Sequence, residues 1–270
     1  MLQRAKRAYR EGDDFLMRRS VDECAERLGA VQRSFGHAAA LLGRTDYLFD
    51  SLTASGKCEQ VIRIEDEHLA DAEDMKLEDE SLDLVVAPLS LHWMNDLPGA
   101  LVQINRALRP DGLLMATLPG PETLRELRAS LLYAEAEHSR GVAQRIDAFT
   151  DVRDAGALLQ RAGFALPVSD HDLVTVRYDS PRALVWDLRR FGAGYHMEQK
   201  ARAPLSRSVW QAAVDHYAQN YSDADGRIRA TFQLVSLSGW KPHSSQQKPL
   251  KPGSAKARLA DALNVDERKV

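Results

Sequence analysis

The sequence predicts an α/β protein in which a mostly parallel sheet is covered by helices on both faces. Three observations lead to this prediction. Short apolar segments typical of strands alternate with amphipathic helical segments through about residue 165. Residues 82–86 are almost continuously apolar, as expected for a strand buried on both faces. Glycine and proline turns such as residues 109–112 separate these segments.

The composition excludes several classes of protein. A net charge of −3 and a pI near 6.3 argue against a general nucleic-acid binder, which would carry a basic excess. The chain has no apolar run of the roughly 20 residues that a transmembrane helix needs. Its basic start lacks the apolar core of a signal peptide. We therefore expect a cytoplasmic protein in which Cys24 and Cys58 are reduced.

Residues 38–46 have the pattern of a ligand-binding turn between a strand and a helix. Residues 38–42 suit a small buried strand, Gly43 opens a turn, and Thr45 or Asp46 can cap the helix that follows. A strand, a glycine turn and a helix place backbone N–H groups against a ligand. A nucleotide-binding loop would carry further glycines at positions 45 and 47, but this chain has Thr45 and Tyr47 there.

A second strand is predicted over residues 60–65, and it ends in acids. Glu65 is placed to bind a ribose diol, as acids at this position do in dinucleotide-binding sheets, or it belongs to a plain acidic turn. A parallel crossover needs about a dozen residues or more. The chain between Glu65 and Leu82 hardly holds both a helix and a third strand, so we expect a shortened second crossover.

Residues 82–105 are the centre of the predicted site. They read as a buried strand, a loop carrying His92 and Trp93, and a helix capped by Asn95 or Asp96. His92 is either a general base or a loop histidine bonded to backbone. Trp93 either contacts a cationic substrate by cation–π attraction or packs under a cap.

The second half of the chain predicts further helices and two long strands. Residues 164–178 and 228–237 show the alternation of strands, and helices are expected at 122–137, 151–162, 181–191 and 206–221. Residues 181–222 should form a helical cap within a domain spanning 1–240. Tyr195 and His196 in this cap either contact substrate or pack in the core.

The last segment, residues 241–270, differs from the rest in composition. It is rich in proline, serine, glutamine and lysine, so we expect an extended or partly disordered tail. Its lysines either dock a partner protein or remain solvated.

Ligands in such sheets bind at the carboxyl ends of the strands, where the strand order reverses. The predicted site residues at that edge are Gly43, Glu65, Asp71, Leu89 and His92. The sequence shows no P-loop, no Ser-His-Asp arrangement and no metal-ligand spacing.

At residues 71–101, DAEDMKLEDESLDLVVAPLSLHWMNDLPGAL, the chain resembles class I S-adenosylmethionine-dependent methyltransferases. RALRPDGLL and QRAGF, before the next two strands, agree with this resemblance. It implies a Rossmann-like sheet with a helical insertion before the last strand. PLSLHWMNDLPGAL, DAFTDVRDAGALLQRAGF and the ending around GWKPHSSQ resemble bacterial relatives of the mitochondrial complex I assembly factor that is an arginine hydroxylase. The malonyl-carrier-protein O-methyltransferases of biotin synthesis are more distantly similar.

The resemblance implies S-adenosylmethionine as cofactor and assigns roles by motif. Asp71 and Ala72 would face the adenine, and Glu65 or Asp66 would hold the ribose. These four residues form the adenosine half of the implied site.

Leu89 and Ser90 would line the methionine end, and Gly43 would be what remains of the glycine loop. The family pattern has glycines where this chain has Thr45 and Tyr47. Overpacking costs about 1–3 kcal/mol. It would weaken cofactor binding by roughly fivefold to a hundredfold.

Two functions follow from this reading. The first is an S-adenosylmethionine-dependent enzyme that acts on a protein side chain or a small acid, with complex I assembly implied by the resemblance. The second is a non-catalytic member that keeps the fold and acts as an assembly or interaction factor. The sequence leaves methylation and hydroxylation both open.

Overall fold

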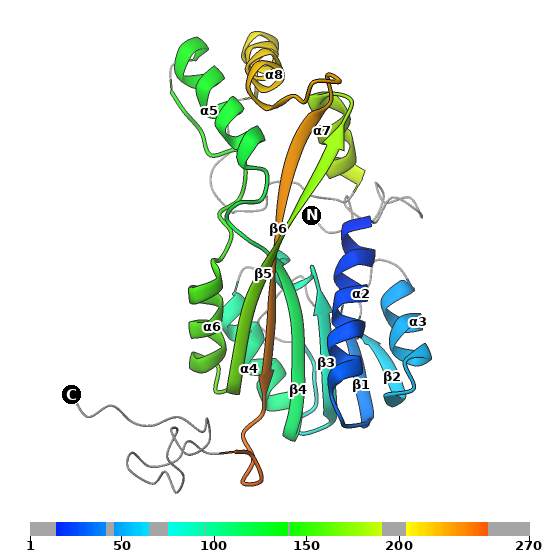
Figure 1. Cartoon of the computed structure of the whole chain (residues 1–270). Helices are drawn as coiled ribbons and strands as arrows, with labels where there is room; N and C mark the ends of the chain where they lie inside the picture. Colours follow the sequence, from blue (N-terminus) through cyan, green and yellow to red (C-terminus); the bar gives the residue numbers. More distant parts are fainter. Residues whose placement is uncertain are drawn as a thin grey trace, which may run out of the picture.

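The computed structural model describes residues 15–41, 46–64, 75–94, 96–139, 141–190 and 204–247 of the chain. One sheet organises these residues, with strand order β2-β1-β3-β4-β6-β5 (Figure 1). Its strands are β1 (Phe35–Leu41), β2 (Cys58–Ile64), β3 (Leu82–Pro88), β4 (Leu108–Pro119), β5 (Ala165–Tyr178) and β6 (Ile228–Trp240). The helices are α2 (Phe15–Ala30), α3 (Tyr47–Ala54), α4 (Leu97–Ala107), α5 (Arg125–His138), α6 (Val152–Arg161), α7 (Pro181–Arg190) and α8 (Arg207–Tyr221).

The sheet is parallel in its first four strands. β1 pairs in parallel with both β2 and β3, and β3 pairs in parallel with β4. β6 lies antiparallel between β4 and β5. The prediction of a parallel sheet is therefore confirmed for β1 to β4, while the last two strands add an antiparallel pair. The strand order reverses at β1, because β2 and β3 lie on its opposite sides.

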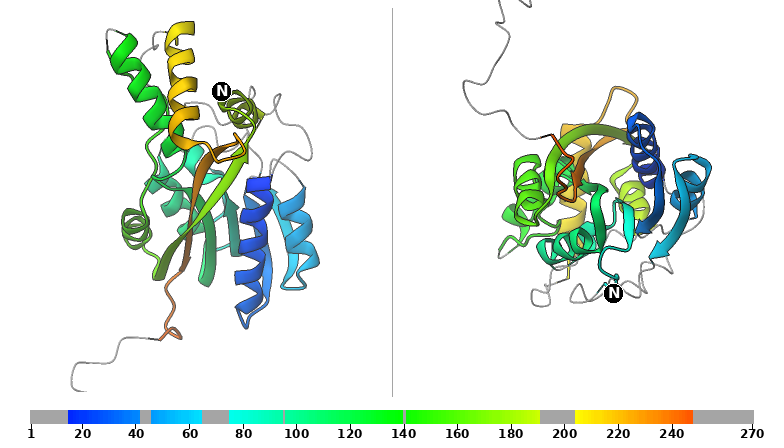
Figure 2. Two further views of the ribbon diagram at one scale, coloured as in Figure 1. Left: turned by 45° about the horizontal axis from the view of Figure 1, so that its top comes forward. Right: turned by 90° about the horizontal axis from the view of Figure 1, so that it is seen from below.

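Helices lie on both faces of the sheet (Figure 2), and an apolar core fills the space between sheet and helices on each face. Ala38 and Ala40 of β1 pack toward α2 and α3, whereas Ala39 and Leu41 pack toward α4 and α6. This alternation follows from the two-residue period of a strand. It explains why a strand covered on both faces is apolar at nearly every position.

The helix termini follow the signals in the sequence. The Asp96 carboxylate caps α4 by accepting from Gly99 N at 2.8 Å, and Pro98 lies in the first turn. Asp151 caps α6 by accepting from Asp154 N at 2.8 Å. Gly163 has a φ of +87° just after α6, as expected for a glycine that ends a helix.

The beginning of β4 differs from its prediction, and hydrogen bonds join it to the first residues of the predicted tail. Residues 109–112, expected as a turn, lie within β4, where Asp111 has a φ of +66°. Lys241 N donates to Gly112 O at 2.8 Å, and Gln246 Nε2 donates to Asp111 Oδ1 at 3.0 Å. Lys241 and Gln246 are thus hydrogen-bonded to the beginning of β4. Residues 248–270 lie outside the described range.

The connection between β2 and β3 is described only in part. Residues 75–81 form neither helix nor strand, and residues 65–74 lie outside the description. None of the helices in the described ranges combines the length and the apolar character of a membrane span.

A long antiparallel pair of strands, β5 and β6, projects past the other strands. Pro119, the last residue of β4, pairs with Leu234, so residues 228–233 of β6 extend beyond the carboxyl end of β4. There they pair with residues 173–178 of β5. Helices α5, α7 and α8 surround this projection and form a third apolar core with it (Figures 1 and 2).

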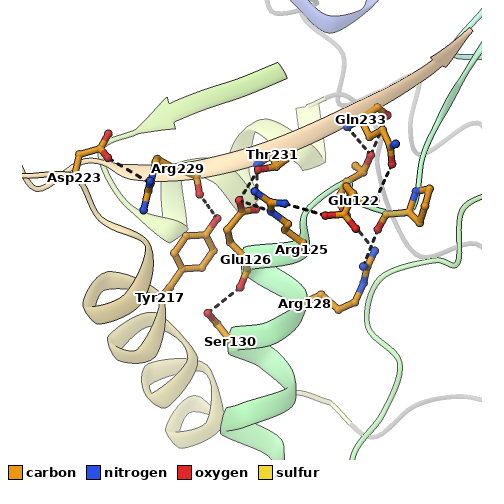
Figure 3. Close-up of polar contacts among 12 residues, drawn as sticks. Glu122, Arg125, Glu126, Arg128, Ser130, Tyr217, Asp223, Arg229, Thr231 and Gln233 are labelled. Atoms are coloured by element: carbon orange, nitrogen blue, oxygen red, sulfur yellow. Dashed lines mark hydrogen bonds and ion pairs between the residues drawn. The ribbon is translucent and has the colours of Figure 1, made fainter. Parts of the chain in front are cut away.

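Polar contacts join α5 and α8 to the projecting part of β6 (Figure 3). Glu126 is 5% exposed, and its carboxylate accepts from Thr231 N at 3.0 Å and from Thr231 Oγ1 at 2.5 Å. The Tyr217 hydroxyl donates to Arg229 O at 2.8 Å. Burial raises the pKa of Tyr217, so this hydroxyl remains a neutral donor. These bonds determine where α5 and α8 stand above the strand ends.

Candidate functional site

The loop after β3 presents its side chains at the carboxyl edge of the sheet. Leu89 N donates to Thr117 O at 2.9 Å, and Leu89 has a φ of +45°. A left-handed backbone at a residue with a side chain costs about 1–2 kcal/mol. One 3₁₀ turn, Leu91–Trp93, follows, and its first residue, Leu91, is fully buried. This anchored turn carries His92 and Trp93 to the edge.

A cavity of about 480 Å³ lies at this edge. Its wall combines the β3 loop with the end of β4, residues 145–149, β6, and helices α2, α5, α7 and α8. Most lining side chains are apolar, and the polar ones are His92, Thr123, Arg145, Asp147, Arg189 and Gln233. Sites for small molecules and cofactors usually enclose about 300–1,000 Å³. The cavity is therefore the candidate functional site.

The structure brings together three of the predicted site residues. Leu89, His92 and Trp93 all line the cavity. The rings of His92 and Trp93 lie 4.4 Å apart between centroids with an interplanar angle of 41°. Both rings are half-buried, which suits contact with a ligand and packing alike.

Ser90 lies between these residues but is buried, with 1% of its surface exposed. In the described part of the chain, no hydrogen-bond partner is found for Ser90 Oγ. Buried polar atoms are normally satisfied, so this hydroxyl is available to a polar group at the strand end.

The remaining predicted site residues lie outside the described residues. They are Gly43, Glu65, Asp66, Asp71 and Ala72, together with Tyr195 and His196 of the predicted cap. Tyr47, expected to crowd the glycine loop, packs against α2. Its hydroxyl donates to Asp22 Oδ1 at 2.5 Å, and the Arg18 guanidinium carbon lies 4.5 Å from its ring centroid.

One wall of the cavity depends on a buried ion pair. The side chain of Glu135 on α5 is 3% exposed and accepts from Arg145 Nε at 2.8 Å and Arg145 Nη2 at 2.7 Å. Its second oxygen accepts from Ala143 N at 2.8 Å. The ion pair holds residues 143–149 on α5 and so places Asp147 and Phe149 in the wall. Local periodicity gave no signal for this segment.

A second wall is made where the chain leaves β4. Thr123 Oγ1 donates to Gln233 O at 3.1 Å, and Gln233 N donates to Thr123 Oγ1 at 3.1 Å. Leu124 N donates to Thr231 O at 2.7 Å, and Leu124 has a φ of +57°. Gln233 and Thr123 are 110 residues apart in sequence, so no sequence pattern identified them.

Known proteins match this chain both in sequence and in fold. Residues 36–116 match the family described as methyltransferase domain. The YcgJ protein of Bacillus subtilis superimposes with a TM-score of 0.52 at 13% identity, over 84% of this chain and 99% of that chain. A putative methyltransferase of Bacillus halodurans gives a TM-score of 0.51 at 13% identity, over 82% and 98%. The chain has the class I methyltransferase fold.

Two groups of curated proteins are homologous to this methyltransferase-like chain. The mitochondrial arginine hydroxylase NDUFAF5 of Danio rerio is 42% identical over 73% of this chain and 61% of its own length, and the Homo sapiens protein is 42% identical over 73% and 57%. The malonyl-[acyl-carrier protein] O-methyltransferase of Laribacter hongkongensis is 36% identical over 68% and 59%. The chain thus spans about three fifths of the length of these relatives.

The described residues fit the methionine end of S-adenosylmethionine. They offer the buried Ser90 hydroxyl beside the left-handed Leu89, at the ends of the parallel strands, where ligands of such sheets bind. The cavity opens next to this position and can hold a methyl acceptor. The residues predicted to bind the adenosine lie outside the described residues.

Proposed function

We propose that this chain is an S-adenosylmethionine-dependent, methyltransferase-like enzyme that modifies a side chain of another protein during respiratory complex I assembly. The observation that carries the proposal is the cavity of about 480 Å³ directly beside the loop that carries Leu89, Ser90, His92 and Trp93. The names of the homologues, arginine hydroxylase and O-methyltransferase, support modification of a group outside the cofactor.

In this proposal the two halves of the site have separate tasks. Leu89 and Ser90 hold the methionine end of the cofactor, and Asp71 and Glu65 hold the adenosine end. The cavity excludes water and orients the acceptor. Alignment of the two reacting groups is a large part of catalysis for such transfers, so the walls matter more than a catalytic dyad.

His92 and Trp93 act on the acceptor side. A neutral imidazole at the cavity edge can take a proton from the acceptor. The Trp93 ring can contact a cationic side chain such as that of arginine. Both roles rest on the position of the two residues in the cavity wall.

The alternative is a non-catalytic member of the fold that acts as an assembly or interaction factor. The observation that favours it is the loop with Gly43 as its one glycine and with Thr45 and Tyr47 in place of others. In that case the cavity and cap would contact a partner protein, and the cofactor would be dispensable.

Titration calorimetry with S-adenosylmethionine and S-adenosylhomocysteine separates the two. If the chain is such an enzyme, we expect it to bind S-adenosylmethionine in the micromolar range. Asp71→Ala should weaken this binding, and the matched control Asp79→Ala should leave it unchanged. Asp79 is exposed and pairs with Arg106. If neither compound produces heat at high micromolar concentration, the enzyme is excluded and the alternative stands. If the Thr45→Gly variant binds S-adenosylmethionine more tightly than the parent chain, the loop after Gly43 is what weakens cofactor binding.

A further inference from the structure

Three exposed side chains form a stripe along helix α7, which we call the α7 stripe. They are Arg182, Trp186 and Arg189, and their spacing of four and three residues places them on one face of the helix. Trp186 is 53% exposed. The opposite face carries Leu184 and Leu188, which are buried in the apolar core that α7 shares with α5, α8 and β6. The described fold therefore leaves the α7 stripe on the surface.

The two arginines of the stripe have no carboxylate partner in the described part of the chain. Neither Arg182 nor Arg189 forms an ion pair there, whereas the arginines at the adjoining ends of β5 and β6 do. Asp187, the one acidic residue of α7, accepts from the Tyr178 hydroxyl at 2.7 Å. The Arg189 guanidinium carbon lies 5.7 Å from the centroid of the Trp186 ring, within cation–π range. The stripe thus offers two cations with an aromatic ring between them.

The α7 stripe borders the candidate functional site. Val185, Leu188 and Arg189 all line the cavity, and of these three Arg189 is exposed. Arg189 therefore lies where the cavity meets solvent. A partner that rests on the stripe lies beside the opening of the cavity.

We infer that the α7 stripe docks an acidic segment of a partner protein, in which two carboxylates flank an apolar side chain. Arg182 and Arg189 each donate to one carboxylate, whose geometry matches the two parallel N–H groups of a guanidinium. The apolar side chain packs on Trp186, and tryptophan and arginine are both enriched at the centres of protein interfaces. The inference does not depend on cofactor binding, because an enzyme would hold its protein substrate here and an interaction factor its partner.

An anionic membrane also attracts arginine and tryptophan, but the α7 stripe suits a membrane less well. Segments that bind anionic lipids carry clusters of about 4–8 lysines and arginines, whereas the stripe has only Arg182 and Arg189. A helix that lies in a membrane interface turns its apolar face to the lipid. The apolar face of α7 is buried in the core. A protein partner is therefore favoured.

The length of the stripe defines a test peptide. Arg182 and Arg189 lie about 10 Å apart along the helix axis, at a rise of about 1.5 Å per residue. An extended segment covers this distance in about three residues. Two glutamates that flank two leucines therefore have the spacing to meet both arginines.

Three blocked peptides test the inference by NMR without any cofactor. N-acetyl-Glu-Leu-Leu-Glu-amide should shift the indole N–H signal of Trp186, which the Trp186→Phe variant identifies. N-acetyl-Gln-Leu-Leu-Gln-amide should bind at least about fivefold more weakly, because two exposed ion pairs are lost. N-acetyl-Glu-Ser-Ser-Glu-amide should also bind more weakly, because it has no apolar side chain for the indole ring. Equal affinity for the three peptides, or no shift with any of them, would overturn the inference.

Charge reversal identifies the residues that act. The double variant Arg182→Glu, Arg189→Glu should lose the preference for the glutamate peptide over the glutamine peptide, and it should fold, because both side chains are exposed. The matched control Arg153→Glu, Arg161→Glu, on the exposed face of α6, should keep that preference. An equal loss in both double variants would assign the effect to overall charge and overturn the inference. Circular dichroism verifies that each variant folds.

The remaining outcomes separate this inference from a membrane site and from the proposed function. If the parent chain sediments with phosphatidylglycerol vesicles and the Arg182→Glu, Arg189→Glu variant does not, the stripe binds lipid and the inference fails. If the glutamate peptide binds while S-adenosylmethionine produces no heat, the docking surface stands and the enzyme fails. If S-adenosylmethionine binds and the peptide does not, the enzyme stands and the docking surface fails.

Discussion

Gly120 lies directly against the side chain of Gln233. A Cβ atom at position 120 would stand 2.6 Å from Gln233 Oε1 and 2.7 Å from its Cδ, closer than real Cβ atoms approach other atoms. Position 120 therefore needs a glycine, because Gln233 of β6, which lines the cavity, leaves no room for a Cβ atom there.

Gly120→Ala should displace Gln233 and destabilise the protein by about 1–3 kcal/mol, as overpacking does. Urea unfolding measures this difference. Gly141→Ala is the matched control, because no atom lies within 4 Å of a Cβ added there. An unchanged unfolding midpoint in Gly120→Ala would mean that Gln233 moves away at no cost.

Arg145→Met should destabilise the protein strongly, because it leaves the Glu135 carboxylate buried without its cation. The two side chains are 20% and 3% exposed. Removing one partner of a buried ion pair costs about 3–5 kcal/mol. Thermal unfolding should show a large loss for this variant and almost none for Arg153→Met on the exposed face of α6. Comparable losses for both would show that the ion pair does not hold the wall.

The contact between α2 and β5 should weaken in acid. The Arg27 guanidinium lies 2.6 Å from Asp170 and holds the pKa of that carboxyl below its usual value of 3.8. A lowered pKa means that the stabilisation is complete above about pH 3.8 and is lost as the pH falls through the folded-state pKa.

Asp170→Asn should therefore lower stability at neutral pH by up to about 1 kcal/mol, since the two side chains are 37% and 46% exposed and solvent screens the pair. The difference from the parent chain should shrink below about pH 3.8. Unfolding at pH 7, 5 and 3 tests this, and Arg27→Met should remove the same pH dependence. A difference that grows in acid would contradict the assignment.

The two cysteines should react at different rates. Burial raises the pKa of the Cys24 thiol to about 11 and also raises that of Cys58, which is only half-buried. The thiolate is the reactive form, so at pH 8 iodoacetamide should label Cys58 first. Mass spectrometry of the labelled protein distinguishes the two sites. In Cys58→Ser labelling should nearly stop, and rapid labelling of Cys24 there would show that α2 opens from β4.

Local sequence signals were enough for most individual elements. Asp96, one of the two residues predicted to cap α4, does cap it, because such a signal acts within one helical turn. The buried strand β3 followed from its continuous apolar run for the same reason. The boundary of β4 was less accurate, because Asp111 continues the strand in a left-handed conformation held by Arg33 and residues 241–247.

The sequence by itself determined the α/β alternation, the buried parallel strands and the loop that carries Leu89, His92 and Trp93. Only the tertiary structure decided that β6 lies antiparallel between β4 and β5 and that its projecting half meets α5 and α8. It also decided the cavity wall, in which Gln233 meets Thr123 across 110 residues. Apolar periodicity and capping are short-range properties of the chain, whereas contacts between distant segments depend on how all the elements pack together.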